Sequence, residues 1–172
     1  MEHSRRKPTR LREYNYSENG TYFVTICTKD KRPTLCNIVG GGTHDAPQIQ
    51  LTAIGCIVEK YIQSTNQISA VTVDEYVIMP NHVHLLLSIN HGDGTSWAPS
   101  PTSTMRANQI LPHAISTLKR LVNRDVGYHV WQRSFHDHVV RGEQDYREIW
   151  NYIDQNPLRW REDELYNGTL PD

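Results

Sequence analysis

The stretch VTVDEYVIMPNHVHLLLSI, residues 71–89, decides the fold that the sequence predicts. Residues 71–80 and 82–89 are two runs rich in apolar and β-branched residues, and runs of this length are typical of β-strands. The Pro80-Asn81 step between them is a turn signal. The stretch therefore predicts a β-hairpin whose second strand carries two histidines.

The sequence on both sides of this hairpin predicts a small α+β domain. Apolar periodicity predicts a strand at 21–29, a helix at 50–67, a helix at about 106–124, one or two short strands within 129–140 and a helix at 143–155. Two segments rich in Gly, Pro, Ser or Thr, at about 33–48 and 90–105, predict flexible loops. Helices packed on one face of an antiparallel sheet in this order predict a ferredoxin-like (RRM-like) α+β fold, with an additional C-terminal helix.

Length and charge predict one domain preceded by a basic arm. At 172 residues the chain is long enough to bury a core of its own. We expect an arm at 1–20, a domain at 21–160 and a C-terminal tail at 161–172. The first twelve residues carry a formal charge of +4 and the remainder −5, because the arm contains Arg5, Arg6, Lys7, Arg10 and Arg12 against one acidic residue. Such an arm suits local contact with a polyanion, and a solvated tail is the alternative.

The cysteines and the apolar runs indicate a protein of the cytoplasm. Cys27, Cys36 and Cys56 form no CxxC pair, and their odd number argues against a disulfide framework. No apolar run reaches the roughly 18 residues of a membrane span, and no signal-peptide core follows the basic start. We expect a cytoplasmic protein with reduced thiols and no membrane partner.

The two histidines of the hairpin are candidates for a metal site. Side chains alternate across a strand, so His82 and His84 share one face while Val83 lies on the other, and the two imidazoles can share one divalent ion. The pattern alone is weak, because nine histidines in 172 positions give one such triplet by chance roughly half the time. A second triplet indeed stands at 136–138. Structural histidines bonded to backbone are the alternative.

A further ligand is offered by the last predicted helix. No cysteine spacing suits a zinc module, whereas two imidazoles with an amide or carboxylate oxygen suit Mg²⁺ or Mn²⁺ acting on a phosphate. Tyr152 lies off the apolar stripe of this helix, and Asn156 follows one turn later on the same side. A phenol and an amide oxygen are thus offered together, although helix geometry alone favours an ordinary semi-exposed tyrosine at position 152.

Together these stretches resemble the single-tyrosine HUH transposases, named for their histidine, bulky apolar, histidine motif. The resemblance is greatest to the transposases associated with repetitive extragenic palindromes (REP) in bacteria, within the IS200-like transposase family. The matching stretches stand in the family's order and are YFVTI (22–26), VIMPNHVHLLL (77–87), VWQRSFHDHVVR (130–141) and DYREIWNYIDQNPLR (145–159).

The resemblance implies a role for each candidate residue. His82 and His84 would ligate Mg²⁺ or Mn²⁺, Tyr152 would be the nucleophile, and Asn156 would be the third protein ligand. Insertion-sequence relatives commonly carry glutamine at that last position, and asparagine is a variant already met in the palindrome-associated branch, so Asn156 is favoured over Gln155 as the ligand. The family fold is a ferredoxin-like sheet with the tyrosine on a C-terminal helix, in agreement with the fold predicted above.

The resemblance also implies an activity and a partner. Members of the family cleave single-stranded DNA beside hairpins and transfer the strand through a 5′-phosphotyrosine intermediate. This chain would then act on single-stranded DNA with a REP-like hairpin, in the bacterial cytoplasm and in association with the nucleoid. Some relatives are dimers that share sites and others act as monomers, so whether this chain forms a homodimer stays open.

Basic residues are expected to hold the DNA. The cations of the arm would contact phosphates or bases beside the hairpin, and Lys119, Arg120 and Arg124 on the second helix are further candidates, with a solvated helix face as the alternative. His136 and His138 flank the WQRSF segment and are expected to be structural or close to DNA.

Two other functional classes compete with a transposase. A non-catalytic or domesticated nucleic-acid-binding protein can have the same sheet, but RNA-recognition modules carry exposed aromatic residues on their central strands, where this chain has histidines. A metal-dependent hydrolase of a small phosphoester would leave Tyr152 without a role.

Overall fold

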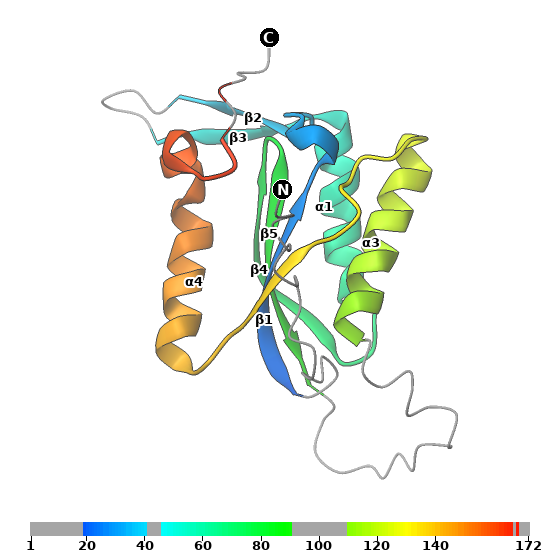
Figure 1. The fold of residues 1–172 in the computed structure, drawn as a ribbon, viewed down its shortest axis with the longest axis vertical. Helices are drawn as coiled ribbons and strands as arrows, with labels where there is room; N and C mark the ends of the chain where they lie inside the picture. Colours follow the sequence, from blue (N-terminus) through cyan, green and yellow to red (C-terminus); the bar gives the residue numbers. More distant parts are fainter. Residues whose placement is uncertain (1–18, 41–45, 91–109, 167, 169–172) are drawn as a thin grey trace, which may run out of the picture.

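The structure is a computed structural model that describes residues 19–40, 46–90, 110–166 and 168 (Figure 1). The five basic residues predicted to hold DNA from the arm, and nearly all of the loop predicted at 90–105, lie outside the described residues, so those expectations stay predictions. No helix among the described residues has the length and apolar character that a bilayer crossing requires.

Four strands form one antiparallel sheet in the order β4-β5-β1-β6. They are β1 (Gly20–Cys27), β4 (Val71–Met79), β5 (His82–Ile89) and β6 (His136–Val139). β4 and β5 form the hairpin predicted at 71–89. With one helix after β1 and another after β5, this order is the ferredoxin-like arrangement, so the predicted α+β fold is confirmed.

Helices cover both faces of the sheet. The helices are α1 (Ala53–Thr65), α3 (Ile110–Val126) and α4 (Glu143–Gln155), with the short 3-10 helices η1 (Lys29–Lys31) and η2 (Asn156–Glu162). α1 and α3 pack side by side on one face, and α4 lies on the opposite face (Figure 1). The C-terminal helix therefore covers a face that the other two helices leave open.

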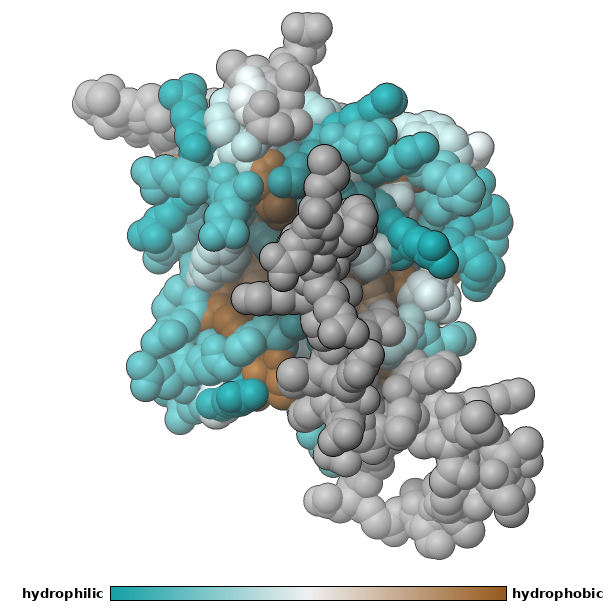
Figure 2. Space-filling model, viewed as in Figure 1, coloured by the Kyte–Doolittle hydropathy of each residue, from teal (hydrophilic) through white to brown (hydrophobic). Residues whose placement is uncertain are grey.

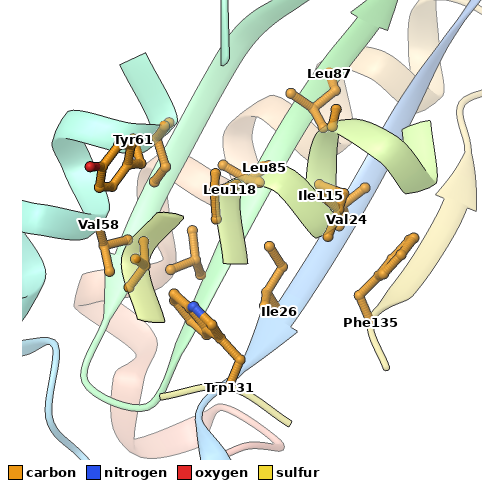
Figure 3. Close-up of a cluster of buried hydrophobic side chains, with 14 of the residues drawn as sticks. Val24, Ile26, Val58, Tyr61, Leu85, Leu87, Ile115, Leu118, Trp131 and Phe135 are labelled. Atoms are coloured by element: carbon orange, nitrogen blue, oxygen red, sulfur yellow. The ribbon is translucent and has the colours of Figure 1, made fainter. Parts of the chain in front are cut away.

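The main hydrophobic core lies between the sheet and the pair α1 and α3 (Figure 3). It includes Val24, Ile26, Leu85 and Leu87 from the sheet and Val58, Tyr61, Ile115 and Leu118 from the helices. A smaller cluster under α4 and η2 contains Leu86, Ile153 and Trp160. The residues of β5 thus alternate between two cores, which is why its histidines face α4. In the space-filling view, hydrophilic residues cover most of the outer sides, and hydrophobic residues show in the middle (Figure 2).

The loop predicted at 33–48 is wrong in part, because a second hairpin begins there. β2 (Cys36–Val39) pairs antiparallel with β3 (Gln48–Leu51). β2 is anchored by the buried Cys36, whose thiol donates a hydrogen bond to the Ile78 carbonyl at 3.1 Å. The prolines and glycines that predicted a loop lie on either side of four residues, CNIV, that fit a strand.

The chain continues past α4 into part of the predicted C-terminal tail. Pro157 has no N–H to extend the α-helix, and the chain tightens into η2. The η2 residue Trp160 is buried beneath α4, so the following residues are brought back over the sheet. These residues take part in the site described next.

Candidate functional site

His82 and His84 lie at the start of β5, on the sheet face that α4 covers. Both side chains are buried, with 0% and 3% exposure, and their Nε2 atoms are 3.0 Å apart. Two neighbouring ligands at about 2.1 Å from an octahedral ion lie about 3.0 Å apart, so this separation suits a shared cation.

Each ring is oriented by a hydrogen bond at its other nitrogen. The His82 Nδ1–H donates to Asn81 Oδ1 at 2.8 Å, and the Asn81 amide nitrogen donates to the Leu165 carbonyl at 2.8 Å, which fixes the direction of this amide. His84 Nδ1 is hydrogen-bonded to Thr25 Oγ1 at 2.9 Å. A hydroxyl can donate or accept, so His84 can present an Nε2 lone pair. Partners of this kind characterise histidines that bind metals.

The buried environment keeps both imidazoles neutral. Burial lowers the pKa of His82 to about 3, with a smaller contribution from the Lys31 ammonium. Burial likewise lowers the pKa of His84 to about 3, helped by His82 and opposed by the Asp163 carboxylate. At pH 7 both rings are therefore uncharged, which is the form that ligates a cation.

Tyr152 reaches the histidines from α4. Its phenol oxygen lies 3.5 Å from His84 Nε2 and 3.4 Å from Asp163 Oδ2, to which it donates. The ring packs edge-on against Phe23 of β1, while 44% of the side chain stays exposed. The structure therefore brings the predicted nucleophile and the predicted metal ligands together in one place.

The surroundings of Tyr152 hold its phenol in the protonated form. Burial raises the pKa of Tyr152, and the Asp163 carboxylate raises it further, whereas the Asn156 amide acts in the opposite direction. A phenol with a raised pKa is a poor nucleophile unless a positive charge offsets the developing negative charge.

Asn156 presents a buried oxygen to the site. The side chain is 3% exposed, and its amide nitrogen donates to Asp163 Oδ2 at 3.2 Å. Its Oδ1 is buried and has no hydrogen-bond partner among the described residues. A buried acceptor without a partner lowers the free energy of unfolding by roughly 1–3 kcal/mol. A cation bound by this oxygen would remove that cost. Gln155, the alternative ligand, is exposed.

Asp163 is a site residue that sequence reasoning missed. Its Oδ2 lies 3.9 Å from His82 Nε2, and one ligand atom each from His82, His84 and Asp163 fall within 4.8 Å of one another. Its Oδ1 accepts the Leu165 N–H at 2.6 Å, which holds the carboxylate in place. Asp163 follows an irregular turn, so no helical or strand spacing relates it to the histidines. Asn81, which orients His82, is a second residue of this kind, because the sequence marks it only as part of a turn.

A cleft of about 490 Å³ opens beside Tyr152 between α4 and η2. Acidic residues line much of it, and Arg159 is its one basic lining residue among those described. The cleft gives a ligand access to the phenol, while the histidines remain buried behind it.

The three basic residues predicted on the second helix lie on α3, on the sheet face opposite the histidines. The Lys119 ammonium donates to the carbonyls of Gln132 at 2.5 Å and Arg133 at 3.2 Å. The Arg124 guanidinium bonds the Asp125 carboxylate and the phenol of Tyr61. Arg120 is exposed. The structure does not bring these residues to the histidine site, and their contact with DNA stays a prediction.

The second His-x-His triplet lies on β6, apart from the cluster of His82, His84 and Asp163. His138 Nε2 is 3.0 Å from the Asp145 carboxylate, at the start of α4, and His136 is exposed. Of the two triplets in the described residues, only the one at 82–84 is buried with converging nitrogens.

Comparisons with known proteins agree with this fold. No family model matches the chain. An uncharacterized protein of Haemophilus influenzae is 32% identical over 176 residues, which span 94% of this chain and 93% of that protein. A solved structure of a REP-associated tyrosine transposase bound to a REP hairpin matches with a TM-score of 0.60 and 19% identity, over 95% of this chain and 93% of that chain. The chain belongs to the same family as the Haemophilus influenzae protein, and its fold is that of the REP-associated tyrosine transposase.

Proposed function

We propose that this protein is a DNA transposase that cleaves and rejoins single-stranded DNA through Tyr152. One observation carries the proposal: the phenol oxygen of Tyr152 lies 3.5 Å from His84 Nε2, one of the two converging nitrogens of a buried histidine pair, at the edge of an open cleft. The fold shared with a tyrosine transposase supports the same assignment. A hydrolase of small phosphoesters would not need this tyrosine.

The chain's own residues fit a divalent cation. His82 Nε2, His84 Nε2 and the orphaned Asn156 Oδ1 would hold it, with the Asp163 carboxylate beside them. Nitrogen and oxygen donors in this combination suit Mg²⁺ or Mn²⁺. When bound, the cation would supply positive charge that polarises the scissile phosphate and offsets charge developing in the transition state.

The cleavage step follows from the position of the phenol. The Tyr152 oxygen attacks the phosphorus, its proton passes to Asp163 Oδ2 at 3.4 Å, and a tyrosine–phosphate bond forms as the bond to the 3′ oxygen breaks. The 3′ oxygen takes up this proton from Asp163 through water, which leaves a 3′-hydroxyl, a 5′-phosphotyrosine and the Asp163 carboxylate restored. The covalent link conserves the phosphodiester energy, so the reverse attack rejoins strands without a nucleotide cofactor.

The substrate would be a single strand beside a hairpin. Tyr152 is only partly exposed, and a strand must bend into the cleft to align with it, which a duplex resists. The related solved structure is of a transposase bound to a REP hairpin, and a hairpin of this kind is the substrate we propose for this chain.

A covalent adduct tests the proposal. The protein is incubated with Mn²⁺ and a labelled single-stranded hairpin oligonucleotide, and denaturing gels are examined for a protein–DNA band. We expect an adduct with the wild type and none with Tyr152→Phe or in EDTA. Tyr146→Phe, on the same helix and half-buried against the smaller core, is the matched control and should form the adduct.

The same experiment distinguishes a transposase from a non-catalytic nucleic-acid-binding protein. An adduct of equal yield with Tyr152→Phe would show that another residue is the nucleophile. Hairpin binding without any adduct, across several hairpins, would instead identify a non-catalytic nucleic-acid-binding protein.

A further inference from the structure

A second concave surface lies at the end of the sheet where α3 stops. Residues 127–135 connect α3 to β6 (Figure 1). Residues of this segment line two pockets. One, of about 640 Å³, is bounded by α3 and includes Arg120 and Arg133. The other, of about 410 Å³, is bounded by η1 and includes Lys29 and Arg32. His129 lines both pockets, which are together called the basic groove here.

The segment that lines both pockets is held by hydrogen bonds to α3 and to η1. Val130 and Trp131 are buried, and Val130 donates to Asn123 of α3 at 2.9 Å and accepts from the Lys29 N–H at 2.7 Å. The Lys119 ammonium binds the carbonyls of residues 132–134. The groove is therefore built before any ligand arrives, which lowers the entropy lost on binding.

The groove is positively charged within a protein of net charge −1. Its α3 pocket is lined by no acidic side chain among the described residues, and its η1 pocket has Asp30 against Lys29 and Arg32. Arg120 and Arg133 are exposed, and neither belongs to an ion pair of the described residues. Unpaired guanidinium groups in a concavity suit phosphates.

An aromatic side chain stands beside these charges. Tyr128 lines the η1 pocket and is 54% exposed. It lies between Gly127, whose φ of +86° turns the chain, and the buried Val130, so the core does not require its ring. Aromatic rings that alternate with basic residues are the usual means of binding single-stranded nucleic acid, because every base has a face to stack on.

The groove begins beside the histidine site. Cys27 at the end of β1 pairs with His82, and Thr28 Oγ1 donates to the Asn81 carbonyl at 3.0 Å. The next residues form η1, whose Lys29 lines the η1 pocket. The η1 pocket of the groove, which Thr28 lines, therefore lies at the end of the sheet where β5 begins with His82.

We propose that the basic groove binds the single-stranded DNA that flanks the strand held at Tyr152. Arg120 and Arg133 contact phosphates, and a base stacks on Tyr128. The inference rests on the proposed function for its substrate class, but the groove itself is tested without cleavage.

Binding is measured in EDTA with Tyr152→Phe as the background, so that no cleavage occurs. The probe is a fluorescein-labelled oligodeoxythymidine of about 20 nucleotides, followed by fluorescence anisotropy across a range of salt concentrations. We expect Arg120→Gln with Arg133→Gln to weaken binding about tenfold and to reduce the slope of log affinity against log salt by about 1.4, since each phosphate contact on a single strand contributes about 0.7. Lys60→Gln with Arg147→Gln removes two exposed cations outside the groove and should leave the slope unchanged.

Tyr128 gives an independent signature. Tyr128→Ala should weaken binding at every salt concentration without changing the slope, because stacking releases no counterions, and Tyr128→Phe should bind as the background protein does. Thermal unfolding of each variant checks that it is folded.

Unchanged affinity and slope in the arginine variant would overturn the inference. Tighter binding to a blunt duplex of the same length than to the oligodeoxythymidine would overturn it as well, because it would assign the groove to duplex DNA. The groove variants could weaken binding as expected while the wild type forms no adduct with any hairpin. That result would support DNA binding by the groove and contradict the proposed transposase activity.

Discussion

At the scale of single residues, the site depends on which nitrogen each histidine presents. His82 and His84 are held at Nδ1 by Asn81 and Thr25, so both direct Nε2 to the same point. The chain thereby brings two buried imidazole nitrogens and one orphaned amide oxygen, Asn156 Oδ1, into a small space. Such an arrangement opposes stability unless a cation is bound, which is expected where function has shaped the site.

The role of Asn81 can be measured through metal affinity. Asn81→Ala removes the acceptor that holds His82 Nδ1, and we expect Mn²⁺ affinity to fall about 10–100-fold, because outer-sphere partners of a ligating histidine contribute this much. Titration of free Mn²⁺ by electron paramagnetic resonance measures the change. Asn81→Asp keeps the acceptor for His82 but loses the amide donor to the Leu165 carbonyl, so it separates the two contacts of this side chain. Equal affinity in Asn81→Ala and the wild type would rule out this orienting role.

Asn156 should affect metal binding more than stability. Its Oδ1 has no partner, so Asn156→Ala removes one hydrogen bond to Asp163 and also one unsatisfied acceptor. We expect the free energy of unfolding in EDTA to change by less than about 1 kcal/mol, while Mn²⁺ affinity falls. Urea unfolding with and without Mn²⁺ checks both effects. A loss of stability in EDTA with unchanged Mn²⁺ affinity would make Asn156 a structural residue.

At the scale of elements, the sequence predicted α4 and the β4–β5 hairpin well. Both have strong apolar periodicity, and Pro157 marks the end of α4. β2 was missed because four residues among glycines and prolines carry too little periodic signal. Asp163 was missed for a related reason, since it reaches the site through the irregular η2 turn and not through a spacing within one element.

The junction between β2 and α1 depends on a single glycine. A Cβ on Gly55 would lie 2.0 Å from the Leu35 carbonyl oxygen, a backbone atom that also accepts hydrogen bonds from Thr52. Gly55→Ala should therefore destabilise the protein by about 2–3 kcal/mol, although alanine favours a helix by about 1 kcal/mol. Chemical denaturation measures this change, with Cys56→Ala at the neighbouring exposed position as the control. Equal stability of the two variants would contradict this close packing.

At the scale of the whole molecule, the sheet separates two kinds of surface. α1 and α3 close the main core on one face, and α4 with η2 covers the histidines on the other. Strand alternation predicted that His82 and His84 share a face, and helical spacing predicted that Tyr152 and Asn156 share a side. That these two pairs meet depends on α4 crossing to the open face, which is a property of the chain's topology that no local pattern in the sequence contains.

The buried histidine pair makes the stability of the molecule depend on pH in a defined direction. The folded protein holds both pKa values at about 3, whereas an unfolded histidine has a value of 6.5. Between these values the unfolded chain binds more protons than the folded protein, so stability is lost as the pH falls below about 6.5 and is unaffected by the pair above it.

At pH 5 each histidine should reduce the free energy of unfolding by about 2 kcal/mol relative to pH 7, because each pKa unit corresponds to about 1.4 kcal/mol. Urea unfolding in EDTA at the two pH values measures the change. The double variant His82→Gln with His84→Gln should lose less unfolding free energy between pH 7 and pH 5 than the wild type does. Nuclear magnetic resonance of the wild-type imidazoles gives a direct check that needs no variant. A titration of either ring near pH 6.5 in the folded protein would show that burial does not hold the pair neutral, and it would contradict this prediction.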